Sequence, residues 1–368
     1  MKKVLEVFGE PISRGGQESY VMSALQNMDL SDLIIDLFTP YYCNNQECID
    51  YINQIGGKVI HADMPFIVGG SRREIIPCFK SYLKKNKYDI VHIHSGSISV
   101  LAYYARIATK CGVQKVIVHS HSSGAKENLK HFFMKLYASS IFKKYVTNFC
   151  ACSIEAAKWK FPKSVLKRVK ILNNGINLNK YKYNPIIRKK MRDFYGIDES
   201  ELVLGHVGRF TYEKNQSFLI EILKEYLNTI GNAKLVLVGD GNELKNVKNK
   251  AKKYGVEDNV IFAGSRNNVD EYMSMFDIFL FPSIYEGLGI VGIEAQASGL
   301  PVIASDKIPR TICVTNNVSF INLNEKLFWC KEIEKKKYFK RKIYTQEIKK
   351  NGFDILDTAN DIRVMYFE

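Results

Sequence analysis

Short apolar runs, rich in β-branched residues, alternate with longer helical patterns along the whole chain. In the first half these runs predict six strands: Lys3–Phe8, Leu33–Phe38, Lys58–His61, Asp89–His94, Lys115–Ser120 and Asn148–Ser153. Helical patterns fill the spaces between them, most clearly at Gln17–Met28, Pro77–Asn86, Ile98–Lys110 and Glu127–Ser140. Such an alternation is typical of a parallel sheet with helices on both faces. Ligands of these sheets bind beyond the C-terminal ends of the strands.

The second half of the chain repeats this alternation with different residues. Its apolar runs predict six further strands: Leu202–Val207, Lys234–Val238, Asn259–Phe262, Ile278–Phe281, Pro301–Ala304 and Val318–Ile321. A turn at Asn173–Asn177 and a polar, irregular stretch at Tyr181–Pro185 separate the two series. We therefore expect an α/β protein of two doubly wound, Rossmann-like parallel-sheet domains, residues 1–178 and 179–352. The two domains would face a cleft suited to a two-part substrate.

The composition is that of a globular protein with a strong positive charge. Hydrophobic residues make up 46% and charged residues 25% of the chain, and no stretch approaches the roughly 20 apolar residues that cross a bilayer. Glu6 interrupts the first apolar run, which favours a core strand over a signal peptide. The eight cysteines lack metal-ligand spacing and indicate reduced thiols in the cytoplasm. The net charge of +15 predicts an anionic partner, whether nucleic acid, phosphorylated substrate or membrane surface.

The stretch from Pro282 to Asp306 carries the clearest candidate chemistry. Glu294 is isolated among small and apolar residues, which is costly unless a partner binds its carboxylate. Glu286 precedes it, and a glycine turn at Gly287–Gly289 opens a helix predicted over about Ile290–Ser298. Unpaired amides at such a helix start favour phosphate, and carboxylates accept hydrogen bonds from sugar hydroxyls. A tight turn with Glu294 capping nearby amides is the alternative, but the two carboxylates together favour a ligand.

A second candidate lies at a predicted strand end, within Gly208–Asn215. Arg209 and Lys214 stand there just before a helix start, where positive charge is unfavourable. An arginine offers a bidentate fork to phosphate, and a lysine offers a movable point charge. We therefore expect both side chains to bind an anion such as a diphosphate rather than to be ordinary surface cations. The turn Val238–Gly241 is expected to be a tight turn without a ligand.

Two loops of the first half also follow predicted strands. Gly15 and Gly16 open a helix and allow close approach to a ligand, although a simple strand-to-helix turn explains them equally well. Neither this loop nor any other segment fits the dinucleotide fingerprint G-x-G-x-x-G. His119 and His121 end another strand, and we expect their side chains on opposite faces, so that at most one meets a shared ligand. With no cysteine or aspartate cluster nearby, we expect no metal site.

Together these motifs resemble the retaining GT-B glycosyltransferases of family four over essentially the whole chain. The matching segments are GGQE at 15–18, His121, NNGIN at 173–177, GRFTYEKN at 208–215, VGDG at 238–241 and the pair Glu286 and Glu294. Each motif is modest alone, and their order and spacing make the resemblance specific. The likeness is greatest to bacterial enzymes of capsule and exopolysaccharide assembly. Asn177 and Thr311 depart from the family, which often has acidic residues at both positions. The change at Asn177 is harmless at a turn. Because Thr311 lies in the 306–316 loop, we assign no function to that loop.

The resemblance implies an enzyme that takes a nucleotide sugar, by default a UDP-sugar, retains the anomeric configuration and needs no metal or other cofactor. It assigns the donor diphosphate to Arg209, Lys214, Leu288, Gly289 and Ile290, the last three through their backbone amides. Glu294 would bind the ribose, and Glu286 would contact the transferred sugar. In the first domain His121 would lie beside that sugar, and Gly15 and Gly16 would cover the phosphates.

The resemblance also implies a glycan or lipid-linked saccharide as the acceptor, bound by the first domain of a cytoplasmic enzyme at the inner face of the cell membrane. Residues 353–368 would form a helix that crosses back to that domain. A predicted helix from Lys126 to Tyr137 carries an apolar stripe: Leu129, Phe132, Phe133 and Leu136. Cations accompany it: Lys126, Lys130, Lys143, Lys144, Lys158, Lys160 and Lys163. This pattern suits an anionic membrane surface, whereas the core-facing side of an ordinary helix is the alternative.

Two other functions compete with this reading. A nucleotide-sugar epimerase of the same fold would need acid and base residues on both faces of the sugar, and only His121 and Glu286 are candidates. A basic nucleic-acid-binding protein would fit the charge and the 21 Tyr and 21 Phe residues available for stacking. The cations are dispersed, however, and no recognition motif is present, so we expect no nucleic-acid partner.

Overall fold

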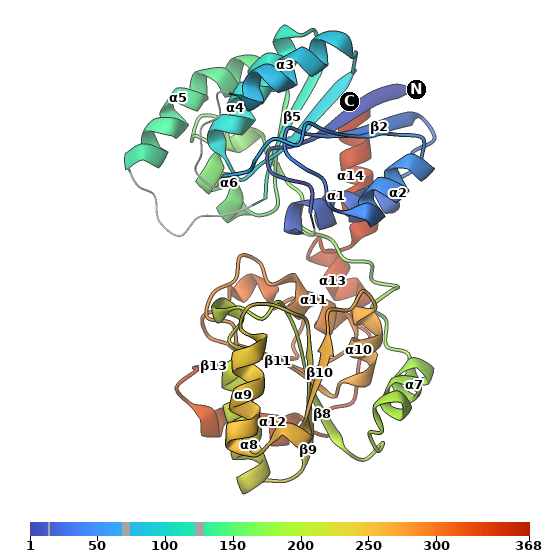
Figure 1. Ribbon diagram of the computed structural model, residues 1–368, viewed down its shortest axis with the longest axis vertical. Helices are drawn as coiled ribbons and strands as arrows, with labels where there is room; N and C mark the ends of the chain where they lie inside the picture. Colours follow the sequence, from blue (N-terminus) through green and yellow to red (C-terminus); the bar gives the residue numbers. More distant parts are fainter. Residues whose placement is uncertain (14, 68–73, 122–128) are drawn as a thin grey trace. The chain divides into compact units, whose positions relative to one another are not determined.

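The computed structural model describes the chain except for residues 14, 68–73 and 122–128. It forms two compact units, each built around one parallel sheet (Figure 1). The first unit comprises Met1–Gly175 and Gly352–Glu368, and the second comprises Ile176–Asn351. The predicted fold class, an α/β protein with two doubly wound sheets, is confirmed.

Seven parallel strands form the first sheet, in the order β3-β2-β1-β4-β5-β6-β7. Their bounds are β1 Lys2–Phe8, β2 Leu33–Thr39, β3 Val59–His61, β4 Ile90–His94, β5 Lys115–Ser120, β6 Asn148–Ala151 and β7 Val169–Ile171. The order reverses between β1 and β4, so the loops after these strands meet at the point where such sheets bind ligands. The sequence pattern predicts six of these strands; β7 is only three residues long, includes a lysine and is largely exposed.

Helices cover both faces of this sheet (Figure 1). One face carries α3 (Ile75–Lys85), α4 (Ile98–Lys110) and α5 (Leu129–Tyr145), and the other carries α1 (Gly16–Gln26), α2 (Gln46–Gln54) and α14 (Ile355–Phe367). A short helix, α6 (Ile154–Lys160), follows β6. Side chains of β1 alternate between the two layers: Leu5 and Val7 pack with α3 and α4, whereas Val4 and Phe8 pack with α1 and α14. Glu6 lies on this second side, beside His92, His94 and Tyr366.

Six parallel strands form the second sheet, in the order β10-β9-β8-β11-β12-β13. They are β8 Leu202–Val207, β9 Ala233–Val238, β10 Val260–Gly264, β11 Ile278–Phe281, β12 Val302–Ser305 and β13 Val318–Ile321. The helices are α7 Pro185–Tyr195, α8 Gln216–Thr229, α9 Leu244–Tyr254, α10 Val269–Met275, α11 Ile290–Ala297, α12 Lys326–Lys336 and α13 Thr345–Lys350. The strand order reverses between β8 and β11, which makes the loops after these two strands neighbours.

No helix among the described residues is both long enough and apolar enough to cross a bilayer. All eight cysteines are free. Neither the sheets nor the helices of the described chain are therefore tied together by disulfides, and each unit rests on its apolar core.

Candidate active site

The loops after β8 and β11 form one site in the second unit. Asn215 Nδ2 donates a hydrogen bond to the carbonyl oxygen of Pro282 at 3.2 Å, and the amide of Ile284 donates to the carbonyl oxygen of Glu213 at 2.8 Å. Asn215 has a left-handed backbone (φ 55°) and stands at the N-cap of α8. The structure thus brings the two motif segments, 208–215 and 282–289, into direct contact.

Lys214 and Glu286 form an ion pair in this site. Lys214 Nζ lies 2.6 Å from Glu286 Oε1, and Ser283 Oγ donates to the same oxygen at 2.7 Å. The side chains of Lys214 and Glu286 are 25% and 9% exposed, so the pair is largely shielded from water while the ammonium remains accessible. Charges at this depth interact more strongly than on an open surface. The family resemblance implies separate roles for these two residues, and the structure places them side by side.

Arg209 is held near this pair by its backbone rather than by its side chain. Gln216 Nε2 donates to the carbonyl oxygen of Arg209 at 3.0 Å. The guanidinium is exposed and makes no hydrogen bond or ion pair with the described residues, so it is free to meet a ligand. The adjoining amide of Phe210 donates to the carbonyl oxygen of Asp240 at 2.9 Å. A Cβ at Gly239 would lie 2.1 Å from a backbone oxygen of this loop, so the VGDG turn serves as its close-packed support.

The glycine turn before α11 leaves backbone amides unpaired. α11 begins at Ile290, and Gly289 stands at its N-cap with φ 79° and no side-chain cap. A Cβ there would approach the Phe281 ring to 3.0 Å in addition to straining the backbone, so the position requires glycine. The amides of Leu288 and Gly289 find no acceptor in the described chain. This helix start can therefore donate hydrogen bonds to an anion, with the helix dipole in support.

Glu294 lies one turn into α11 and contacts a residue that the sequence motifs do not include. Tyr181 donates its hydroxyl proton to Glu294 Oε1 at 2.7 Å, and Ser298 Oγ donates to the carbonyl oxygen of Tyr181 at 2.6 Å. Burial raises the pKa of Glu294 above its ordinary value. The carboxylate therefore bonds a hydroxyl rather than capping neighbouring amides, which is the chemistry a ribose would offer. Tyr181 carries no recognisable signal in the sequence because it lies far from Glu294 along the chain.

His206 at the end of β8 is a second residue without a sequence signal. It is buried, Nδ1 donates to the carbonyl oxygen of Leu280 at 2.9 Å, and burial lowers its pKa to about 4. Its Nε2 has no partner among the described residues and lies 3.2 Å from the position of a Cβ at Gly208. The ring is thus a neutral support beneath the Arg209 loop.

In the first unit, Gly15 and Gly16 form the turn between β1 and α1. A Cβ at Gly15 would lie 2.5 Å from Glu18 Oε2, whereas Gly16 faces open space. Glu18 folds back toward the loop, where Oε1 accepts from the amide of Ser13 at 3.4 Å, and burial raises its pKa. Gly15 therefore makes room for the acidic residue of its own GGQE motif. Further along α1, the Tyr20 ring lies 5.0 Å from the ring of His121.

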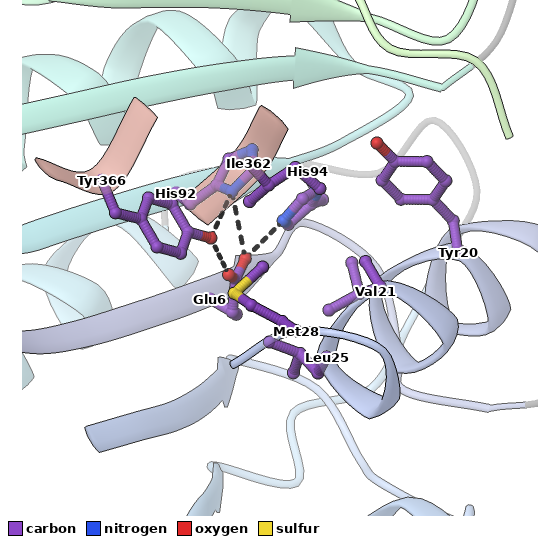
Figure 2. Close-up of a pocket in the computed structure, with 10 residues that line it drawn as sticks. Glu6, Tyr20, Val21, Leu25, Met28, His92, His94, Ile362 and Tyr366 are labelled. Carbon is purple, nitrogen blue, oxygen red and sulfur yellow. Dashed lines mark hydrogen bonds and ion pairs between the residues drawn. The ribbon is translucent and has the colours of Figure 1, made fainter. Parts of the chain in front are cut away.

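A buried chain of hydrogen bonds leads from Tyr366 to His121, and Figure 2 shows its first part, from Tyr366 through Glu6 to His94. Tyr366 of α14 donates its hydroxyl proton to Glu6 Oε1, and His94 Nε2 donates to Glu6 Oε2 at 2.6 Å. His94 Nδ1 then accepts from His121 Nε2 at 2.8 Å. Burial alone raises the pKa of Glu6, but His92 and His94 beside it lower the pKa well below its ordinary value. Burial lowers the pKa of His94 to about 4, so His94 is neutral and its two ring nitrogens have fixed roles.

The expectation that His119 and His121 point to opposite faces is wrong. Their rings stack with centroids 4.2 Å apart, because residues two apart on a strand share a face. The cluster also has nitrogens of His92, His94 and His119 within 4.8 Å of one another, close enough to hold a metal ion. His94, however, already uses both nitrogens in hydrogen bonds, and a metal would have to displace one of them. The described residues therefore fit a hydrogen-bond network better than a metal centre.

Comparison with known proteins places the chain in a family. The model of the family "Glycosyl transferases group 1" matches residues 187–322. A putative glycosyltransferase EpsF of Bacillus subtilis is 32% identical over 84% of this chain and 81% of its own. A UDP-Gal:α-D-GlcNAc-diphosphoundecaprenol α-1,3-galactosyltransferase of Escherichia coli is 29% identical over 67% of this chain and 64% of its own. The fold matches that of Anabaena HepE in complex with UDP, with a TM-score of 0.72 and 18% identity over 98% of both chains.

The family model covers the segment that contains Glu294 and the Lys214–Glu286 pair, and the EpsF match extends the likeness over most of both chains. The chain belongs to the group 1 glycosyltransferases, the family that its motifs resemble.

Proposed function

We propose that this protein transfers a sugar from a UDP-sugar to a glycan or lipid-linked saccharide in bacterial capsule or exopolysaccharide assembly, with retention of the anomeric configuration. The observation that carries this proposal is the Lys214–Glu286 pair beside the open amides of α11, a cationic and hydrogen-bonding site made for a diphosphate-linked sugar. The E. coli relative supports it, since its name specifies a UDP-linked donor and a diphosphate-lipid acceptor. We place the enzyme in the cytoplasm, at the inner face of the membrane.

In this proposal the second unit binds the donor. Arg209, Lys214 and the amides from Leu288 to Ile290, Gly289 included, hold the diphosphate, and Glu294 accepts hydrogen bonds from the ribose hydroxyls. Glu286 contacts the transferred sugar while it fixes the Lys214 ammonium. Positive charge placed before the reaction stabilises the nucleotide diphosphate as it departs, a task that a divalent ion performs in other transferases.

The first unit contributes His121 and the Gly15–Gly16 turn. His121 gives its Nε2 proton to His94, so its Nδ1 carries a lone pair, and this atom is buried without a partner among the described residues. We propose that Nδ1 accepts a hydrogen bond from a hydroxyl of the transferred sugar. The Glu6–His94 chain holds the ring in this orientation. Gly16, which faces open space, leaves room for phosphate oxygens close to the backbone.

Donor binding tests the proposal directly. Replacing Glu294 with alanine should weaken the binding of UDP-sugars by about 10- to 100-fold, because hydrogen bonds to a charged group contribute about 1.5–3 kcal/mol. Isothermal titration calorimetry of wild type and variant against a panel of UDP-sugars measures this. Glu257→Ala removes an exposed carboxylate from the same unit and is the matched control. Equal affinity in wild type and Glu294→Ala would exclude the ribose role.

Turnover should persist in excess EDTA. In this proposal Arg209 and Lys214 supply the positive charge that a divalent ion would otherwise bring to the diphosphate, and Glu286 holds the Lys214 ammonium in the site. The assay compares initial rates after chelation with rates after adding back manganese or magnesium. Activity that disappears on chelation and returns with either ion would contradict the electrostatic role of the cations.

Helix α5 supports a membrane role, because its apolar stripe is not buried in the core. The side chains of the stripe are 78%, 54%, 61% and 62% exposed: Leu129, Phe132, Phe133 and Leu136. The helix packs on the sheet through Ala138, Ile141 and Phe142 instead. The alternative of a core-facing stripe is therefore wrong. We propose that an anionic membrane surface covers it.

The cations expected around α5 divide into two groups. Lys143, Lys144, Lys158 and Lys163 are exposed. Lys160 is buried and donates to the carbonyl oxygen of Gly96, so it takes no part in a charged surface. Lys126 and the side chain of Lys130 lie outside the described residues. The exposed cations lie in the last turn of α5 and in and just after α6, within the same unit as the apolar stripe.

Vesicle sedimentation tests this surface. The protein should pellet with anionic vesicles at low salt, and Phe132→Ser with Phe133→Ser should reduce the bound fraction at least 10-fold, since two exposed aromatic anchors are lost. Leu327→Ser with Phe328→Ser removes two side chains of similar exposure from α12 and should bind as wild type. Equal recovery of all three proteins in the supernatant, with anionic and neutral vesicles alike, would leave α5 without a membrane role.

A further inference from the structure

A basic groove lies between α3 and α4 on the outer side of the first unit. Its volume is about 510 Å³. Five cations line it: Lys80, Lys84, Lys87, Arg106 and Lys110. Ile76, Tyr103, Ile107 and Cys111 form the rest of its wall, and no carboxylate contributes to it. It is thus a hollow lined with positive charge.

The cations of this groove are not balanced by the protein. None of them forms an ion pair with a carboxylate in the described chain. Lys80 and Lys84 are four residues apart on α3, and Arg106 and Lys110 are four residues apart on α4. Like charges at this spacing repel and destabilise each helix. An ordinary solvated surface disperses its charges, whereas this arrangement gathers two rows of cations along one groove, where their potentials add and attract an anion.

The chemistry of the groove suits phosphate. The Arg106 guanidinium can bind two phosphate oxygens at once, and the lysines supply movable point charges for the remaining oxygens. Tyr103, which also lines the groove, adds a hydroxyl. A single chloride-sized anion would engage only one or two of the five cations, whereas a phosphate group offers several oxygens and can engage more of them.

The position of the groove indicates which phosphate. Tyr103 lies beside Tyr137 of α5, with ring centroids 6.1 Å apart and hydroxyl oxygens 3.5 Å apart. Tyr137 is itself exposed, next to the apolar stripe of α5. A phosphate in the groove would therefore be adjacent to a surface that accepts hydrocarbon. A molecule with a phosphate headgroup and an acyl or prenyl chain matches both features at once.

We propose that the α3–α4 groove binds the phosphate headgroup of an anionic membrane lipid. The inference rests on the proposed membrane contact of α5 and deepens it by naming the headgroup site. The groove would orient the first unit on the bilayer, because headgroup and stripe are engaged by neighbouring helices.

The test compares two triple variants of the full chain. Lys80→Gln, Lys84→Gln and Arg106→Gln remove three groove charges; Lys190→Gln, Lys252→Gln and Lys253→Gln remove three unpaired, exposed charges of the second unit. Sedimentation with phosphatidylglycerol and phosphatidylcholine vesicles measures binding. Each basic residue near a membrane surface contributes about 1 kcal/mol to binding, and about 1.4 kcal/mol corresponds to a tenfold change in affinity. The groove variant, which lacks three such residues, should therefore bind phosphatidylglycerol about 100-fold more weakly. The control should stay within about twofold of wild type.

Each other outcome overturns the inference. An equal loss in both triple variants would indicate overall charge rather than the groove, and unchanged binding in the groove variant would exclude the site. The groove would belong to a soluble phosphate if inorganic pyrophosphate bound wild type but not the groove variant, while vesicles bound neither. The same result with a single-stranded oligonucleotide would assign the groove to nucleic acid. Calorimetry with UDP-sugars separates this inference from the proposed function. The groove variant should bind the UDP-sugar as tightly as wild type does. If wild type binds no UDP-sugar, the proposed function is refuted and the groove inference is not.

Discussion

Replacing Lys214 with alanine is expected to lower the turnover of sugar transfer by about 100- to 1,000-fold, the usual cost of removing one preorganised stabilising group from a reaction site. Two effects act together. The departing diphosphate loses a cation, and Glu286 loses the ammonium that lies 2.6 Å from its carboxylate. Because the Glu286 side chain is only 9% exposed, water replaces that partner poorly. Single-turnover kinetics at saturating donor measure the chemical step without product release.

A double variant separates the catalytic role of Lys214 from a structural one. Lys214→Ala combined with Glu286→Gln removes both charges, so no unpaired carboxylate remains. The Glu286→Gln single variant is the reference, because Glu286 itself contacts the transferred sugar in this proposal. If Lys214 only neutralises Glu286, the double variant should turn over as fast as Glu286→Gln alone. We expect it to be much slower, because the diphosphate still lacks its cation, and Lys214→Arg should retain part of the activity. A double variant as active as Glu286→Gln would therefore contradict the assignment.

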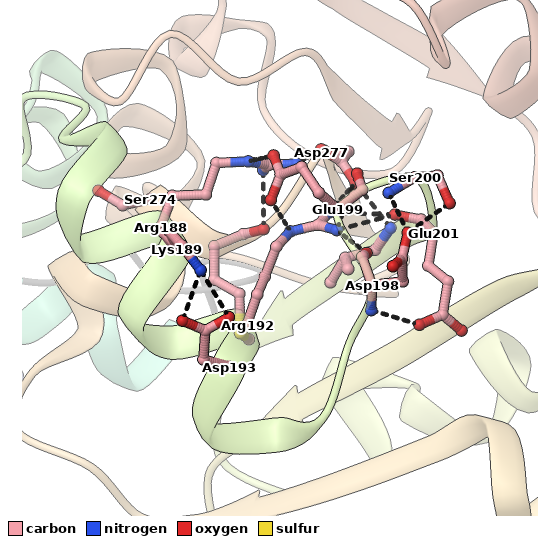
Figure 3. A network of polar contacts seen from close by, with 12 residues as sticks. Arg188, Lys189, Arg192, Asp193, Asp198, Glu199, Ser200, Glu201, Ser274 and Asp277 are labelled. Atoms are coloured by element: carbon pink, nitrogen blue, oxygen red, sulfur yellow. Dashed lines mark hydrogen bonds and ion pairs between the residues drawn. The ribbon is translucent and has the colours of Figure 1, made fainter.

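The second large effect concerns the stability of the second unit, where Arg192 joins α7 to the sheet (Figure 3). Arg192 is 1% exposed, and its Nη2 donates to Asp277 Oδ2 at 2.7 Å. Its Nη1 donates to the carbonyl oxygens of Asp198 at 2.6 Å and Glu201 at 3.1 Å. Asp277 Oδ2 also accepts from the amide of Val203 at 2.8 Å, so one carboxylate links α7 to the start of β8.

Arg192→Met should destabilise the second unit by about 3–5 kcal/mol, because it breaks the buried ion pair with Asp277 and removes the hydrogen bonds to the carbonyl oxygens of Asp198 and Glu201. Urea unfolding in a Trp159→Phe background measures this, since buried Trp329 then reports on the second unit alone. Lys189→Met removes an exposed charge from the same helix and should leave the unfolding midpoint nearly unchanged. An Arg192→Met midpoint equal to that control would show that the network contributes nothing to stability.

The sequence predicted those parts of the site that lie within one short segment. The glycine turn before Ile290, the helix after it and the cations of residues 208–215 are local features, because turn geometry and helix starts depend on neighbouring residues. The positions of Arg209 and Lys214 at the end of β8 follow from the same local pattern. Strand periodicity predicts that His119 and His121, two residues apart, share a face of the sheet. The expectation of opposite faces misapplied this rule.

Helix α5 shows what the sequence pattern cannot decide, namely which of its apolar residues are buried. Apolar residues occur all round this helix, so periodicity does not say which of them meet the sheet. The packing of α5 beside α4 buries Ala138, Ile141 and Phe142 and leaves Phe132 and Phe133 in solvent. That choice depends on where α5 crosses the neighbouring helix, which is a property of the assembled layer.

By itself the sequence determined the alternating α/β architecture, the family and the glycine-framed loops, since each depends on local periodicity or on residues close together in the chain. Only the tertiary structure decided the pairings: Lys214 with Glu286, Tyr181 with Glu294, and Glu6 with His94 and Tyr366. The physical reason lies in the parallel sheet. It brings the C-terminal ends of distant strands to one edge, and which strands become neighbours depends on the strand order of the folded sheet. No spacing along the chain encodes that order.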